Sequence, residues 1–467
     1  RGVLLILDAS TPFGGPATPF TRIWCAFEEH VALTDDGRDS PLLLDIATCH
    51  RGAAQVLTDG LAEADDDSFF GSMVARESKA RREAAFPEEV LARGLSVSLE
   101  TAQASVDSDR VHILNAIAEM PDLDGPPPAD HPNYQLVNRR LRCTFALAAW
   151  PNALRRGKVQ AMGLPRILKA DTGLAELNFT FCGIRGVDDD SLGQLVSNVP
   201  PQLQRVALDL SMCDRLTEAS VKNLGLVMGD LQNLVSLSAN VHKVHSIGNS
   251  GWKDFAAGVS RAPCLQTLKL DGISTIDNPG LRGLARGLSK AKCMQDLTLN
   301  FGAVSCRDDR AIGDRGVCDL AEALAAMKQL KKISLTLSGF KSIGVAGIQG
   351  LAQGFRQLPS LRHIWLNLML CESVGDPCVI ALASCIADLA QLDRVDLLLR
   401  WCPVGDAGAV ALVNGLSGSK SLSRASVDML DTALGDLGKK KLLLGCPNLG
   451  GGFNATYDSP SGKDFLS

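Results

Sequence analysis

Residues 361–386 read LRHIWLNLMLCESVGDPCVIALASCI, and this stretch contains both halves of a pattern that recurs along most of the chain. Leu361, Ile364 and Leu366 stand at L-x-x-L-x-L spacing. That spacing gives the two-residue alternation of a strand with one buried face. A second set of apolar residues follows from Val374 at helical spacing. Each unit therefore predicts a strand, a turn and a helix.

The pattern begins nine times, and successive starts lie 29 to 36 residues apart. A period of this length is typical of a solenoid, in which each unit buries its apolar face against its neighbours. We therefore expect an α/β fold with a curved parallel sheet on the inside and helices on the outside. The nine predicted strands start at Leu174, Leu203, Leu234, Leu265, Met294, Leu330, Leu361, Leu392 and Leu422.

These copies resemble the leucine-rich repeat family, specifically its ribonuclease-inhibitor-like class, whose long repeats carry a full helix. The resemblance implies a horseshoe-shaped solenoid that binds partners on the concave face of its sheet. The family's Asn or Cys ladder after L-x-x-L-x-L is not maintained here. Asp314 and Asp376 stand just before helical runs, and we expect them to cap the free N–H groups of those helices.

Residues between the buried leucines of each strand face the concave surface. Late in the solenoid these positions collect basic side chains beside a tryptophan, and Trp and Arg are enriched among interface hot spots. The alternative is that such strands ordinarily present polar residues and that Arg394 and Asp396 pair with neighbouring strands. The predicted partner-binding residues are Lys332, His363, Trp365, Arg394, Asp396 and Arg424.

Residues 1–118 do not repeat, and they alternate strand patterns with helix patterns, as in a partial α/β sandwich. The apolar run at its start predicts a buried parallel strand. We expect strands at 2–10 and 40–49, a helix at 18–33, a charged solvated segment at 76–84, and a strand, loop and helix across 94–118.

Trp24, Cys25 and Glu28 follow the first strand and resemble the W-C-x-x-E box of Toll/interleukin-1 receptor (TIR) domains. In those TIR domains that cleave NAD this Glu is the catalytic carboxylate, so the resemblance implies Glu28 as a catalytic residue. A carboxylate there would stabilise an oxocarbenium-like transition state. The same box occurs in TIR domains that only assemble. The alternative is that Trp24 packs in the domain core and Glu28 is solvated or caps the helix.

Proline density and apolar spacing divide the remaining chain. We expect 1–118 to be the TIR-like segment, 119–133 a Pro-rich linker, 134–170 a helical N-terminal cap of the solenoid, 171–450 about nine repeats, and 451–467 a disordered tail.

Composition narrows the classes of function. The 467 residues carry a formal net charge of −5, which gives no reason to expect nucleic-acid binding. No apolar stretch is long enough to span a membrane. The 14 cysteines include no C-x-x-C pair, which favours a reducing, cytoplasmic environment over disulfides or zinc. His242 and His245 have no partner at metal-ligand spacing, so we predict neither a metal nor a cofactor.

The sequence as a whole favours binding over catalysis. We expect a protein–protein interaction scaffold that acts in intracellular signalling or assembly through its concave face. The alternative is a TIR-like NAD hydrolase that the repeats regulate.

Overall fold

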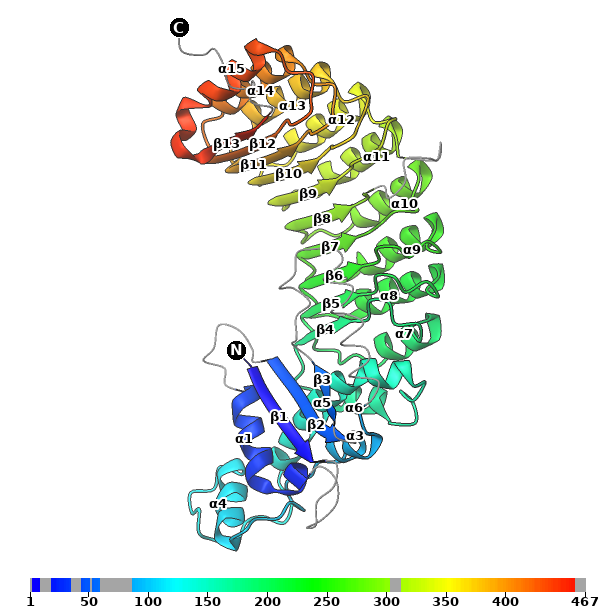
Figure 1. The fold of residues 1–467 in the computed structure, drawn as a ribbon, viewed down its shortest axis with the longest axis vertical. Coiled ribbons are helices and arrows are strands. Elements are labelled where there is room, and N and C mark those ends of the chain that lie inside the picture. Colours follow the sequence, from blue (N-terminus) through cyan, green and yellow to red (C-terminus); the bar gives the residue numbers. More distant parts are fainter. Residues whose placement is uncertain are drawn as a thin grey trace. The chain divides into compact units, whose positions relative to one another are not determined.

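The computed structural model describes residues 2–8, 18–34, 43–50, 53–58, 86–302 and 312–457. The chain divides into two compact units. Unit 1 comprises residues 1–174 with 197–200, and unit 2 comprises residues 175–196 with 201–467. Figure 1 shows the elements of both units under the labels used below.

Unit 2 is an α/β repeat solenoid, as the sequence predicted. Its strands form one sheet in which consecutive strands pair in parallel, from β4 to β13. The sheet lines the concave side of the unit and the helices cover its outer side (Figure 1). The strands are Glu176–Thr180 (β4), Arg205–Asp209 (β5), Ser236–Asn240 (β6), Thr267–Asp271 (β7), Asp296–Asn300 (β8), Lys332–Thr336 (β9), His363–Asn367 (β10), Arg394–Leu398 (β11), Arg424–Asp428 (β12) and Phe453–Thr456 (β13).

The apolar alternation in the sequence sets which face of the sheet is buried. The second and fourth residues of β4 to β12 are buried, whereas the first, third and fifth are mostly half-buried or exposed. Leu268, Ile333 and Val395 each have 0% exposure and lie in this one sheet. The prediction that they share a single buried face is confirmed.

Each strand from β4 to β12 leads to a helix whose apolar side covers the sheet, as for Val317, Leu320 and Leu324. The solenoid helices are Asp189–Val196 (α7), Glu218–Asp230 (α8), Asn249–Val259 (α9), Asn278–Leu288 (α10), Asp314–Ala325 (α11), Val345–Arg356 (α12), Asp376–Asp388 (α13), Asp406–Gly418 (α14) and Asp436–Leu444 (α15).

The carboxylate that opens one helix caps the helix of the next repeat. Asp314, the first residue of α11, accepts hydrogen bonds at Oδ1 from the backbone N–H groups of Gly344 (2.6 Å) and Gly347 (2.9 Å) at the start of α12. Asp376 accepts one from Gly405 (2.7 Å) before α14. The expectation that Asp314 and Asp376 cap their own helices was wrong, because their carboxylates reach across to the neighbouring repeat.

Glycine in the first turn of the helix makes this approach possible. A Cβ atom on Gly347 would lie 2.6 Å from Asp314 Oδ1, and a Cβ on Gly438 would lie 2.6 Å from Asp406 Oδ1. Real Cβ contacts are not this close, so the cap requires glycine there. The Gly in the repeated helix pattern therefore serves the contact between repeats.

The sheet continues past the last predicted repeat. After α15, the 3₁₀ helix Pro447–Gly452 leads into β13, which pairs in parallel with β12. The sequence predicted a disordered tail from residue 451, but Phe453–Thr456 are an ordered tenth strand. The strand has only four residues and follows a Gly-rich run. Because glycine is unfavourable inside strands, the sequence did not predict a strand here.

Unit 1 contains a three-stranded sheet with strand order β1-β2-β3. β1 (Gly2–Asp8) pairs in parallel with β2 (Leu43–His50), and β2 pairs antiparallel with β3 (Ala53–Thr58). The other elements are η1 (Thr18–Thr21), α1 (Ile23–Thr34), α3 (Glu88–Gly94), α4 (Asp107–Ile117), α5 (Pro132–Arg155) and α6 (Leu164–Ala170). The strands and helix expected before residue 50 are thus present, whereas β3 was not predicted.

Helix α5 completes the core of unit 1. Its residues Tyr134, Leu141 and Phe145 belong to the same buried cluster as Leu7 and Ile23. Phe145 packs against Gly94, where a Cβ would lie 2.4 Å from the ring. A capping role of residues 134–170 toward the solenoid, and the other domain boundaries predicted from the sequence, stay predictions.

The strand expected after residue 94 does not form. Residues 95–106 make turns, and Gln103 makes an isolated bridge to Arg22. Side chains of α5 satisfy backbone groups there instead: Leu99 N donates to Asn138 Oδ1 (2.9 Å), and Arg142 Nε donates to Val97 O (2.6 Å). The charged segment 76–84 lies outside the described residues.

Candidate functional site

The six predicted partner-binding residues lie together on β9 to β12. Parallel register places the first residues of these strands side by side and the third residues likewise. Arg394 and Arg424 are exposed, whereas Lys332, His363 and Trp365 are half-buried. We call Lys332, His363, Arg394 and Arg424 the basic column.

Asp396 is buried at the centre of this group, with 6% exposure. Its Oδ2 accepts a hydrogen bond from Arg394 Nε (2.8 Å), and its Oδ1 accepts one from Arg394 Nη2 (3.2 Å). His363 Nε2 lies 2.8 Å from the same Oδ2. Two-point pairing of this kind fixes the orientation of a guanidinium group. Asp396 therefore positions both Arg394, which lies on its own strand, and His363 on the neighbouring strand. The alternative of pairing between neighbouring strands thus holds for Asp396 through His363, whereas Arg394 pairs within β11.

The first and last residues of the basic column, Lys332 and Arg424, differ in whether a carboxylate pairs with them. Lys332 Nζ lies 3.6 Å from Asp296 Oδ2. Arg424 forms no ion pair with any residue that the structure describes. Positive charge is therefore least compensated toward β12.

Trp365 has an apolar neighbour that is not among the residues predicted from the sequence. Leu398, half-buried, is the fifth residue of β11, where other strands carry polar residues such as Asn367 and Asp428. Trp365 pairs with Asp396 in the register, so Leu398 is its diagonal neighbour, within reach of a large side chain. The fifth position is polar in most of the other strands, so the leucine at this position of β11 was the sequence signal that could have identified Leu398.

Most of that polar column is structural. The Oδ1 atoms of Asn and Asp at the ends of five strands accept hydrogen bonds from the backbone N–H two residues later, at 3.0 to 3.2 Å. Such side-chain turns close the strand end. They involve Asp209, Asn240, Asn300, Asn367 and Asp428.

Large apolar residues also stand at the turns after β10 and β11. Leu370 (φ 62°) and Trp401 (φ 58°) adopt the left-handed conformation that Gly339 adopts after β9. Their side chains are 47% and 44% exposed. Arg400 covers the Trp401 ring, with 5.3 Å from its Cζ to the ring centroid. A bulky residue in this conformation is unusual, and no glycine marks the position in the sequence.

The second predicted site lies on α1 of unit 1. Glu28 is exposed, and Trp24 is 42% exposed with its Nε1 donating to Asp109 Oδ2 (3.0 Å). Trp24 is thus not fully packed in the core. The neighbouring Glu29 is buried instead, and burial raises the pKa of its carboxyl to about 7. A catalytic role of Glu28 stays a prediction.

The described residues contain no group of three or more His, Cys, Asp or Glu side chains placed to hold a metal ion. None of the described helices has the length and apolar character needed to cross a bilayer.

No protein-family model matches the chain, and no curated protein matches it. Among solved structures, it is similar to a chain in the crystal structure of the Rad7 and Elc1 complex in yeast. The similarity has 16% sequence identity and a TM-score of 0.33, and it covers 70% of this chain and 90% of the other. A TM-score this low has no bearing on function.

Proposed function

We propose that the chain is a leucine-rich repeat scaffold of the ribonuclease-inhibitor-like class that binds another protein on the concave face of β9 to β12. The observation that carries the proposal is the basic column lying in register beside Trp365. An aromatic anchor framed by arginines is the composition of an interface hot spot.

The arrangement also indicates the chemistry of the partner. Trp365 and Leu398 offer a partly exposed apolar surface, and Arg394 and Arg424 are exposed beside it. Asp396 holds Arg394 and His363 in place before any partner arrives, which lowers the entropic cost of binding. A partner with an apolar side chain flanked by carboxylates complements this surface.

The test compares Trp365→Ala with the unchanged chain. A partner recovered by cross-linking on the full chain is purified, and its affinity is measured by calorimetry. We expect Trp365→Ala to weaken binding by more than about 1 kcal/mol, which is at least about fivefold in Kd. Thermal unfolding changes little, because Trp365 is only half-buried.

Arg424→Glu and Arg205→Glu form a matched pair. Both arginines are exposed first residues of solenoid strands, but Arg205 lies on β5, where Glu176 pairs with it. The proposal predicts that Arg424→Glu lowers the affinity for the partner and that Arg205→Glu leaves this affinity unchanged. Equal binding by Trp365→Ala, Arg424→Glu and the unchanged chain contradicts it.

We place this function in the cytoplasm, in signalling or assembly, as part of the same proposal. Seven of the thirteen described cysteines are buried and all thirteen are free thiols. Cys371 and Cys402 Sγ donate to backbone carbonyls of the preceding repeat, each at 3.0 Å. Thiols used as small buried groups suit a reducing compartment.

A further inference from the structure

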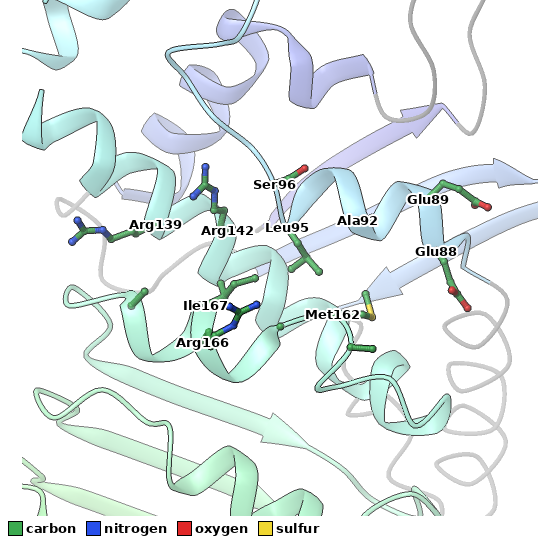
Figure 2. A pocket seen from close by; sticks show the side chains of 13 residues that line it. Glu88, Glu89, Ala92, Leu95, Ser96, Arg139, Arg142, Met162, Arg166 and Ile167 are labelled. Carbon is green, nitrogen blue, oxygen red and sulfur yellow. The ribbon is translucent and has the colours of Figure 1, made fainter. Parts of the chain in front are cut away.

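Unit 1 has a hollow of about 760 Å³ between α3, α5 and α6. Small-molecule sites fall within this range of volume. Figure 2 shows arginines toward one side of the hollow, Glu88 and Glu89 toward the other, and Leu95 and Met162 between them. The neighbouring residues of α5 belong to the NRRLRC run, which the proposed function does not use.

Arg139, Arg142 and Arg166 line the hollow, and the charge of Arg142 acts on the nearby Glu100 carboxylate. Arg139 and Arg142 are three residues apart on α5 and so share one side of that helix, while Arg166 comes from α6. None of the three forms an ion pair within the described part of the chain. Arg142 is held by its bond to Val97 O (2.6 Å). Arginines left unpaired around a concavity match a phosphate group.

The middle of the hollow is apolar and firmly supported. Leu95 and Met162 are half-buried and pack against the core cluster of unit 1. Ile167 lines the same part. A ligand that reaches the arginines therefore lays an apolar or planar body on these side chains.

The opposite side is acidic. Glu88 is held by Lys158 (2.5 Å) and by Arg156 (3.3 Å), and the hydrogen bond from Lys158 lowers the pKa of its carboxyl. Glu89 is exposed beside it. Lys158 and Arg156 already neutralise Glu88, so it is Glu89 that repels a second anionic group and accepts N–H donors instead. The ligand thus has one charged end only.

We propose that this hollow binds a small organic phosphate of the nucleoside monophosphate class. The phosphate contacts Arg139, Arg142 and Arg166, the planar base lies on Leu95 and Met162, and its amino group faces the acidic side. This proposal does not depend on the concave face of the solenoid.

The experiment is calorimetric titration of the full chain with adenosine 5′-monophosphate, adenosine and inorganic phosphate as separate probes. We expect the monophosphate to bind with a Kd below about 1 mM. Adenosine and phosphate bind at least about tenfold more weakly, because each lacks one half of the contacts.

Arg139→Gln and Arg166→Gln each lower the affinity for the monophosphate by about tenfold, which is the loss expected for one charge-assisted contact. Arg93→Gln is the matched control, because Arg93 is exposed on α3 and does not line the hollow. Unchanged thermal unfolding shows that the variants fold. No binding of the monophosphate, equal binding of adenosine, or arginine variants that bind like the unchanged chain would each overturn the proposal.

Discussion

At the scale of single residues, α1 shows how one position decides the chemistry of a carboxylate. Glu28 and Glu29 are adjacent, yet Glu28 is exposed and Glu29 has 6% exposure. Burial raises the pKa of Glu29 to about 7 from an ordinary 4.5. Desolvation penalises the charged form, so the folded chain holds this proton more tightly than the unfolded chain.

This difference predicts that Glu29 makes stability depend on pH. Between about pH 4.5 and pH 7 the unfolded state has released the proton while the folded state keeps it, so stability falls as pH rises through this window. The full loss is about 3 kcal/mol above pH 7. Glu29→Gln removes it, and we expect the melting temperature of the variant to exceed that of the unchanged chain at pH 8 but not at pH 4.

The control for this prediction is Glu28→Gln on the same helix. Its exposed side chain predicts no pH-dependent gain. Each variant is compared with the unchanged chain at the same pH, so the contributions of other titrating groups cancel. His30 is one such group, because burial and the charge of Arg140 lower its pKa. A gain from Glu28→Gln equal to that from Glu29→Gln would contradict the assignment.

At the scale of elements, α11, α12, α14 and α15 each begin on a carboxylate or amide from the preceding repeat. Asn278 Oδ1 accepts from Gly313 N (2.9 Å) and Gly316 N (3.0 Å), as Asp314 does from the start of α12. The free N–H groups of one helix are thus satisfied only when the previous repeat is in place. Capping and stacking are one interaction.

Gly347→Ala tests this coupling. Alanine ordinarily stabilises a helix over glycine by about 0.5–1 kcal/mol. Here its Cβ would lie 2.6 Å from Asp314 Oδ1, so we expect the substitution to lower the free energy of unfolding by about 1–2 kcal/mol through loss of the cap. Urea denaturation followed by circular dichroism measures the change.

Gly193→Ala is the matched control on α7. Its Cβ would meet nothing closer than Asn223 Nδ2 at 3.5 Å, so the ordinary gain from alanine is expected. If both substitutions stabilise the chain, the glycines of the repeat do not serve the cap.

The same elements show what the sequence predicts and what it leaves out. L-x-x-L-x-L spacing predicted the strands because burial alternates with every residue. It did not predict that Asp314 caps the next helix, since that contact depends on the distance between stacked repeats. Likewise, register placed Asp396 beside Trp365, but only packing shows that Asp396 is buried and bonded to Arg394. Trp401 carries no turn signal at all.

At the scale of the whole solenoid, contact runs from each repeat to the next. The substantial contacts between its described helices join neighbours, and each strand pairs only with the strands beside it. Such a stack is nearly one-dimensional, so its stability is a sum of repeat terms and neighbour terms. A local defect is expected to have local effects.

Ile333→Ala in β9 tests this expectation. Ile333 has 0% exposure, so its truncation costs about 2–5 kcal/mol. Hydrogen exchange followed by mass spectrometry should show faster exchange in β8, β9 and β10 first, because these strands share its interfaces. Peptides covering β5 serve as the distant reference and should keep their protection. Equal acceleration from β4 to β12 would show instead that the sheet opens as one cooperative unit, and the neighbour-only account of its stability would fail.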